Sequence, residues 1–125
     1  MNSMAKEKDI QDAILDYLNH VLGLRAWRRN VGATISQYKG KKRLIRFNTK
    51  GMSDIWFIGP NGIHGECEVK QVGESLTEAQ SLFQTEVIRA GGIAFVAHSL
   101  KECASELETA YVQRYWEFKP SWRIR

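Results

Sequence analysis

Apolar residues recur at helical spacing near the start of the chain. The positions that share this spacing are Ile10, Ala13, Ile14, Tyr17, Leu18, Val21 and Leu22. They predict an amphipathic helix that ends at Gly23, a residue type common just after the last helical turn. Glu7 lies three residues before Ile10 and continues the inward stripe. A carboxylate there has two interpretations: a first-turn acid that interacts favourably with the helix dipole, or a group aimed into a site.

Strand-like patterning follows this helix. Residues 24–47 contain glycine turn signals and predict a basic hairpin, although the pattern leaves its register open. Residues 54–58 and 63–71 predict two further strands. Between them, residues 59–62 read Gly-Pro-Asn-Gly, which is a strong hairpin turn.

The second half of the chain alternates helix, strand and helix. Thr77 and Gln80 match a capping box, and the helix that they begin is expected to end at Gly91-Gly92. Gln80 lies on the inward stripe of that helix together with Leu76, Ala79, Phe83 and Val87. Residues 93–97 form a continuous apolar run, typical of a strand covered on both faces. Ser99 and Glu102 then cap the last predicted helix.

Length and composition agree with a single globular domain. The chain has 125 residues, of which 43% are hydrophobic and 26% charged, so collagen-like, disordered and coiled-coil classes are excluded. The order of elements predicts an α/β fold, a mixed β-sheet flanked by α-helices. We expect one domain over residues 1–125, with a core over about 5–113 and a tail over 114–125.

Nothing in the sequence indicates a membrane segment or a secretory signal. The longest apolar runs, residues 55–58 and 93–97, are far shorter than the ~20 residues of a membrane-spanning helix. The N-terminal residues contain no apolar signal core. Cys67 and Cys103 are too few for a disulfide framework, so we expect both to be reduced in a cytoplasmic protein.

Charge is segregated along the chain. Between Tyr17 and Ser53 there are nine Lys and Arg residues and no Asp or Glu, whereas the rest of the chain carries all 14 acidic residues. Cations beside planar rings suit a nucleic-acid backbone, but a solvated lysine-rich hairpin has the same composition. The interleaved rings are those of Trp27, Tyr38 and Phe47. The candidate DNA contacts are Arg28, Arg29, Lys41, Lys42, Arg43, Arg46 and Lys50.

The predicted strand over residues 63–71 has a charged face. Alternation places His64, Glu66, Glu68 and Lys70 on one side of it. On an edge strand this row would simply be solvated. The helix and apolar strand that follow favour an interior strand, and a buried charged row must be paired or must hold a metal.

Asp54 supplies a second carboxylate for this face. It opens the preceding strand, where its side chain can lie across from Glu68. Two carboxylates so close repel one another, and a hard divalent cation such as Mg²⁺ or Mn²⁺ compensates them. Lys70, on the same face, can then position an attacking water and offset charge on a scissile phosphate. An acid-any-Lys triplet occurs by chance about once in such a chain, so the weight of this hypothesis lies in the placement of the residues.

These motifs resemble a known family. Gly51-Met52-Ser53-Asp54 followed by Glu68-Val69-Lys70 is similar to the PD-(D/E)XK nuclease motif, and more narrowly to the VRR-Nuc domain. The resemblance covers about residues 5–100 and implies a restriction-endonuclease-like fold, Mg²⁺ or Mn²⁺ dependence and DNA cleavage. Further segments that match are Glu7-Lys8-Asp9-Ile10-Gln11, Arg29-Asn30-Val31-Gly32 and Thr77-Glu78-Ala79-Gln80.

The resemblance also implies a role for each site residue. Asp54 and Glu68 would be metal ligands, with the carbonyl of Val69 as a further one, and Lys70 would be the catalytic lysine. Glu7 would complete the site from the first helix. Gln80 would orient the lysine or the water. Ser53 stands where the family's naming proline would be, and Glu66 is a secondary rival of Glu68 because its spacing to Lys70 is wrong.

The chain resembles stand-alone VRR-Nuc proteins of phage or prophage type, which implies an enzyme that acts as a homodimer on branched DNA, including four-way junctions. The chain is therefore expected to be a homodimeric, structure-selective endonuclease in a bacterial or phage-infected cell. The alternative is a non-catalytic DNA-binding subunit with the same fold. Candidates for the dimer surface are Tyr111, Tyr115, Trp116, Phe118 and Trp122. Trp27 and Trp56 could stack on bases or pack internally, and His64 could contact DNA or be a surface turn residue.

Overall fold

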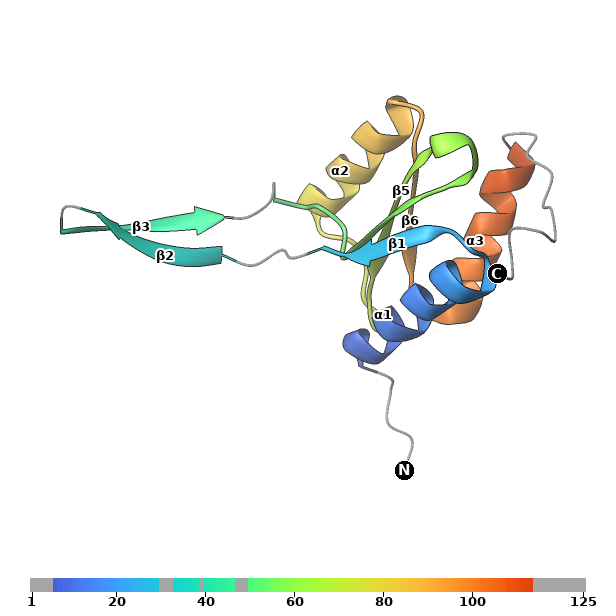
Figure 1. The fold of residues 1–125 in the computed structure, drawn as a ribbon, viewed down its shortest axis with the longest axis horizontal. Helices are drawn as coiled ribbons and strands as arrows, with labels where there is room; N and C mark the ends of the chain where they lie inside the picture. The colour runs from blue at the N-terminus through green and yellow to red at the C-terminus, as the bar shows by residue number, and fades with distance from the viewer. Residues whose placement is uncertain (1–5, 30–32, 39, 47–49, 114–125) are drawn as a thin grey trace.

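The computed structural model describes residues 6–29, 33–38, 40–46 and 50–113 (Figure 1). The helices are α1 (Glu7–Asp16), α2 (Glu78–Arg89) and α3 (Leu100–Gln113), with a π-helical turn at Tyr17–Val21 and a 3-10 turn at Pro60–Gly62. The strands are β1 (Arg25–Arg28), β2 (Ala33–Tyr38), β3 (Lys41–Arg46), β4 (Ile55–Ile58), β5 (His64–Val69) and β6 (Ile93–Ala97).

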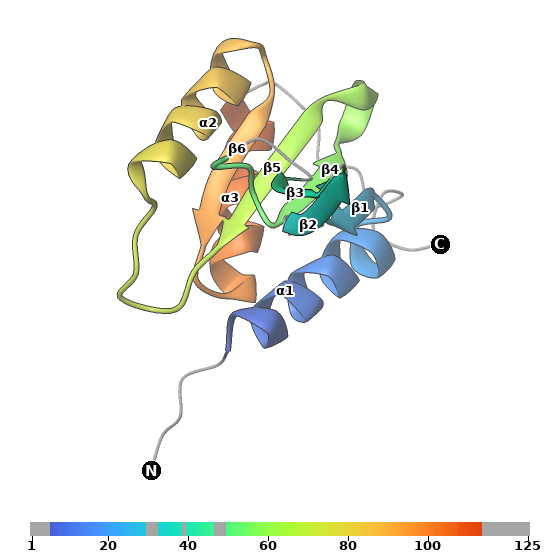
Figure 2. The same ribbon diagram turned by 90° about the vertical axis from the view of Figure 1, so that its left-hand side faces the viewer.

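Four strands form the main sheet in the order β1-β4-β5-β6. The β1–β4 and β4–β5 pairs are antiparallel, whereas β5 and β6 run parallel. Helices α1 and α3 pack on one face of this sheet, and α2 packs over β5 and β6 on the other (Figure 2). The predicted fold class, a mixed β-sheet flanked by α-helices, is therefore confirmed.

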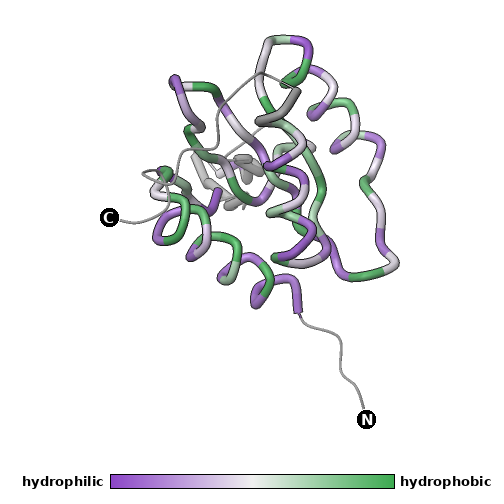
Figure 3. Tube along the Cα trace, turned by 90° about the vertical axis from the view of Figure 1, so that its right-hand side faces the viewer, coloured by the Kyte–Doolittle hydropathy of each residue, from purple (hydrophilic) through white to green (hydrophobic). Residues whose placement is uncertain are grey.

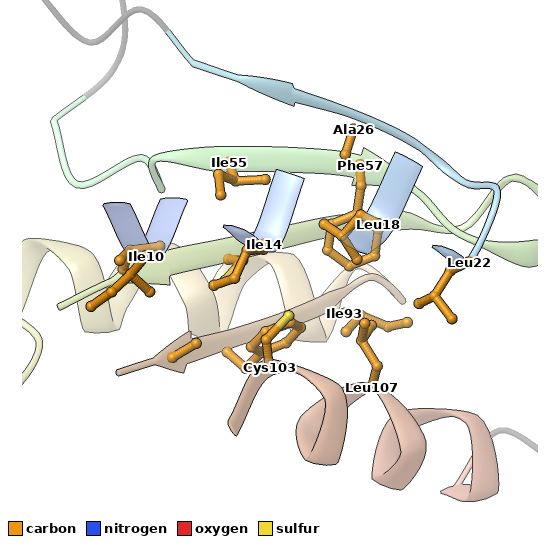
Figure 4. Packing of buried hydrophobic residues seen from close by; sticks show 14 residues of the cluster. Ile10, Ile14, Leu18, Leu22, Ala26, Ile55, Phe57, Ile93, Cys103 and Leu107 are labelled. Atoms are coloured by element: carbon orange, nitrogen blue, oxygen red, sulfur yellow. The ribbon is translucent and has the colours of Figure 1, made fainter. Parts of the chain in front are cut away.

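The hydrophobic core lies between the sheet and the α1–α3 layer (Figure 4). The apolar stripe predicted for the first helix supplies Ile10, Ile14, Leu18 and Leu22, and the sheet supplies Ile55 and Phe57 among others. Along α1 the hydropathy alternates between hydrophilic and hydrophobic segments (Figure 3), as expected of a helix with one face in the core. Both cysteines are free and buried here, Cys67 on β5 and Cys103 on α3.

The first helix does not run uniformly to Gly23. It is α-helical to Asp16, widens into the π-helical turn, and Gly23 then takes a φ of 69°. Asn19, inside the π-helical turn, accepts a hydrogen bond from the Ala26 N–H (2.9 Å) and donates one to the Ala26 carbonyl (3.0 Å). This side chain therefore ties the end of the helix to β1, which is an edge strand of the main sheet.

Residues 24–47 divide between two sheets, so the prediction of one basic hairpin is only partly right. β1 pairs with β4 in the main sheet because its Ala26 packs into the core. β2 and β3 form a separate antiparallel ribbon that projects from the body of the protein (Figure 1).

The second helix departs from its predicted inward stripe. The capping box of Thr77 and Gln80 is present, and the helix ends at Arg89 before Gly91-Gly92. Its predicted apolar stripe is half-buried, and Gln84 is the buried residue, donating from its side-chain amide to the Phe95 carbonyl (2.9 Å). The helix therefore meets this face of the sheet partly through amides: Gln84 bonds the backbone of β6, and Gln80 bonds the Glu68 side chain on β5.

Within the part of the chain that the structure describes, no helix has the length and apolar character needed to cross a membrane.

Candidate functional site

The charged face of β5 is buried. β5 lies between β4 and β6, and the exposed fractions of Glu66 and Glu68 are 0% and 4%. The alternation predicted from the sequence is correct, and the sheet order decides between a solvated edge and an interior strand. Two carboxylates this far from water each need a compensating partner.

Asp54 and Glu68 are interlocked through the backbone of the two strands. Because Ile55 pairs with Cys67 in the antiparallel register, the residues just before and after this pair face each other. The Asp54 N–H donates to Glu68 Oε2 (3.2 Å), and the Val69 N–H donates to Asp54 Oδ2 (2.9 Å). The start of β4 therefore holds the two carboxyl groups side by side, as the sequence predicts.

The Glu68 carboxyl resists ionisation. Burial is the main cause and the adjacent Asp54 carboxylate the second, and together they raise the pKa of Glu68 to about 8 against an opposing effect of Lys70. In the absence of another cation, the pair therefore retains a proton at neutral pH. A pair of carboxyl groups that cannot both be ionised is a site that attracts positive charge.

Gln80 contacts Glu68 directly. Its Oε1 accepts from the Thr77 N–H (2.9 Å) in the capping box, and its Nε2 donates to Glu68 Oε1 (2.9 Å). The same amide thus begins the α2 helix and fixes the orientation of the glutamate. The resemblance implies a glutamine that orients the lysine or the water, whereas in the structure the Gln80 side chain contacts the acid Glu68.

Gly51 allows the turn before β4 to approach the start of α2. Its φ is 90°, and a Cβ atom at this position would lie 2.4 Å from the Ala79 carbonyl oxygen. A larger residue would be strained by its φ and would push the turn away from the helix. The glycine therefore helps to place Asp54 within reach of the residues that surround Glu68.

Lys70 places an ammonium group beside the acid pair. It follows β5, is half-buried, and its N–H donates to the Ala97 carbonyl (3.1 Å). Its charge is near enough to act on the pKa of Glu68. Among the residues that the structure describes, no side-chain hydrogen bond or ion pair engages its ammonium group, which leaves a cation available to an anionic ligand.

Arg29 and Glu66 form a buried ion pair that sequence reasoning did not find. Both terminal nitrogens of Arg29 donate to the two oxygens of Glu66, one of them at 2.9 Å, and Nη1 also donates to the Ser53 carbonyl (3.1 Å). The Arg29 N–H donates to the Asp54 carbonyl (2.7 Å). His64 contacts the same carboxylate. Arg29 therefore anchors the turn that carries Asp54 and occupies Glu66, the rival of Glu68.

Glu7 is not gathered with the acid pair. It begins α1 and is half-buried. Over the described ranges, no three His, Cys, Asp or Glu side chains come close enough together to hold a metal ion. The structure thus brings together Asp54, Glu68, Val69, Gln80 and Lys70, and leaves the expected third acid outside.

The predicted DNA contacts fall into three groups. Arg28 forms an ion pair with Asp12 and donates from Nε to Gln11 (2.9 Å), and Arg29 is turned inward as described above. Lys41 and Lys50 are exposed. The side chains of Lys42, Arg43 and Arg46 on β3 and of Tyr111 on α3, and the other aromatic residues proposed for the dimer surface, lie outside the described part of the structure.

No family model, curated protein or solved structure matches this chain. The resemblance to the VRR-Nuc domain therefore rests on the motif residues themselves and stays a prediction.

Proposed function

We propose that this protein is a metal-dependent DNA endonuclease that hydrolyses phosphodiester bonds. The observation that carries the proposal is the pair of half-buried Asp54 and buried Glu68, with the ammonium of Lys70 beside it and unpaired among the described residues. Phosphodiester hydrolysis needs a centre that binds cations through oxygen and a positive group next to the transferred phosphate. The three side chains provide both within one face of the sheet.

The residues fit Mg²⁺ or Mn²⁺. The raised pKa of Glu68 indicates a site short of positive charge, and hard cations prefer carboxylate and carbonyl oxygens. Asp54, Glu68 and the carbonyl of Val69 would hold the ion. When bound, it would supply a nucleophilic hydroxide at neutral pH and polarise the phosphate.

The remaining residues have supporting roles. Lys70 would bind a phosphate oxygen and offset the negative charge that develops on it. Gln80 holds the Glu68 carboxylate in place. Arg29 holds the turn that carries Asp54 and would act through position, without touching the substrate.

The basic segment and the projecting β2–β3 ribbon support DNA as the substrate. Nine basic and no acidic residues lie between Tyr17 and Ser53, and the ribbon belongs to this segment. A narrow two-stranded ribbon can enter a groove of duplex DNA. Selectivity for branched DNA such as four-way junctions, and action as a homodimer, are further parts of the proposal that follow from the family resemblance.

A non-catalytic DNA-binding subunit is the second candidate. It is favoured by one observation, namely that no third acidic or histidine side chain joins Asp54 and Glu68 within the described residues. In this case the carboxyl pair would be a structural element and the basic ribbon would carry the whole function.

One assay separates the two candidates. Labelled four-way junction, flap and linear duplex are incubated with the protein in Mg²⁺, Mn²⁺ or chelator, beside the variants Asp54→Asn and Lys70→Ala. Lys101→Ala, at an exposed lysine on α3, is the matched control. We expect cutting that depends on the divalent ion, survives in the control and is lost in both site variants. Absence of cutting on every substrate, or equal cutting by the site variants, would reject the nuclease.

A further inference from the structure

Three aromatic rings form a continuous row across the face of the sheet that carries the acid pair. Trp27 on β1 stacks on Trp56 on β4 with ring centroids 4.3 Å apart and an interplanar angle of 23°. Trp56 in turn lies 6.0 Å from the ring of His64 on β5, at 27°. The register explains the row, because Trp27 pairs with Trp56, and Trp56 faces Glu66, the neighbour of His64 on the same side of β5.

This row is not part of the hydrophobic core. The core lies on the opposite face, and α2 covers β5 and β6 but makes no substantial contact with β1 or β4 in the described structure. Trp27 is 41% exposed, and the His64 side chain is 47% exposed. Trp27 therefore keeps a large part of its surface in water. Because β1 is the edge strand of the main sheet, this exposed surface of Trp27 can take a further ring.

The surroundings of the row favour an anionic partner. Arg25 lies two residues before Trp27 on the same side of β1 and is exposed, and no described residue forms an ion pair with it. The segment that contains both has no acidic residue. A second copy of this chain packed symmetrically on this surface would bring like charges together, whereas a nucleic acid brings phosphates to the arginine and bases to the rings.

The row comes within two residues of the candidate active site on β4. Trp56 is two residues from Asp54 along β4, and Glu66 is two residues from Glu68 along β5. Two residues of strand span about 7 Å, so the Trp56 ring, at the centre of the row, lies within the reach of a single nucleotide from the acid pair. A base attached next to the cleaved phosphate could therefore meet the rings, provided that it has left the base stack.

We propose that the Trp27–Trp56–His64 row is a stacking platform for an unpaired nucleobase adjacent to the cleaved phosphate. The inference rests on the proposed nuclease function and narrows its substrate to DNA with unpaired bases at the cut. Aromatic rings hold bases of any sequence, because every base presents a π-face. The platform would thus select structure in preference to sequence.

The test measures binding in chelator, so that no chemistry takes part. The probe is a fluorescently labelled single-stranded thymidine oligonucleotide, compared with an abasic oligonucleotide of the same length and phosphate number. We expect the intact protein to prefer the oligonucleotide with bases. Trp27→Ala should weaken that binding by roughly 5- to 150-fold and leave abasic binding unchanged. Trp27→Phe should retain most of the preference, and Leu82→Ala, at an exposed residue on α2, is the matched control.

Two results would overturn the proposal. One is equal affinity of the intact protein for the two oligonucleotides. The other is a change of oligomeric state in Trp27→Ala, measured by sedimentation, with the base preference intact, which would assign the surface to a contact between copies. If Trp27→Ala does not fold, photocrosslinking of an oligonucleotide containing 5-iododeoxyuridine to the intact protein decides the question: a crosslink at Trp27 or Trp56 supports the platform, and crosslinks only elsewhere reject it.

The outcome is independent of the cleavage assay. If DNA is cut but bases make no difference to binding, the platform fails and the nuclease stands. If the base preference depends on Trp27 but nothing is cut, the nuclease fails, and the platform is left as a binding site that serves the DNA-binding subunit.

Discussion

Replacing Asp54 by asparagine should stabilise the metal-free protein. Asparagine retains a side-chain oxygen that can accept from the Val69 N–H, and the backbone N–H at position 54 can still donate to Glu68 Oε2. The substitution therefore removes one negative charge and keeps both hydrogen bonds. The charge that it removes is the second-largest cause, after burial, of the raised pKa of Glu68.

The size of the effect follows from that pKa. A rise from 4.5 to about 8 corresponds at pH 7 to about 3 kcal/mol of lost stability. Burial accounts for the larger share, and solvent screens the charge of half-buried Asp54, so we expect the variant to recover about 1–2 kcal/mol. For a domain of this size, the melting temperature would rise by roughly 3–8 °C.

The gain should depend on pH. Because the folded pKa of Glu68, about 8, lies above its ordinary 4.5, the folded state holds a proton that the unfolded state loses. The contribution of this proton to the free energy of unfolding is complete below pH 4.5 and is lost as the pH rises through about 8. The His98 pKa is also raised, through its hydrogen bonds to the Glu74 carbonyl and to Glu102, and acts in the same direction. His98 is present in both wild type and Asp54→Asn, so its contribution cancels in the difference between their free energies of unfolding.

The measurement is thermal or urea unfolding in chelator at pH 5, 7 and 9. Asp16→Asn, at an exposed residue, is the matched control and should change stability by less than about 0.5 kcal/mol. Adding Mn²⁺ should raise the melting temperature of wild type and leave that of Asp54→Asn unchanged. A lower metal-free melting temperature in Asp54→Asn, or a pH dependence identical to that of wild type, would refute the electrostatic reasoning.

Three further predictions concern the surroundings of the site. Glu66→Gln leaves the buried guanidinium of Arg29 without a countercharge and should lower the free energy of unfolding by roughly 3 kcal/mol, measured as a fall in the urea midpoint. Gln80→Ala and Thr77→Ala should each lower the free energy of unfolding by about 1 kcal/mol, but Gln80→Ala should impair cleavage more because it also releases Glu68. Neutralising positions 41–43 should reduce the slope of log K for DNA binding against log salt concentration by up to about 3. An unchanged slope would place these cations away from phosphate.

Much of the fold is determined locally and could be predicted from the sequence. The capping box at Thr77 and the Gly-Pro-Asn-Gly turn act over three or four residues, and both are present in the structure. The alternation of polar and apolar residues in β5 also holds, because successive side chains of a strand point to opposite faces. Together with the tight turn, it brings Asp54 opposite Glu68 as predicted.

The choice of partners depends on the tertiary structure. Arg29 and Glu66 are 37 residues apart, and nothing in a run of basic residues shows which one will turn inward to a buried acid. The same reasoning applies to Trp27 and Trp56, whose stacking needs β1 to pair with β4 instead of β2. Glu7 lies on the predicted stripe but does not join the acid pair.

The amino-acid sequence by itself thus determined most of the helical and strand segments, the charged face of β5 and the nearness of the two carboxylates, because short-range spacing and backbone geometry decide them. The sheet order, the burial of Glu66 and Glu68, the contact of Gln80 with Glu68 and the exposed row of rings were decided by how distant segments pack. The free energy of burying a charge or a ring depends on neighbours that come together only in the folded chain.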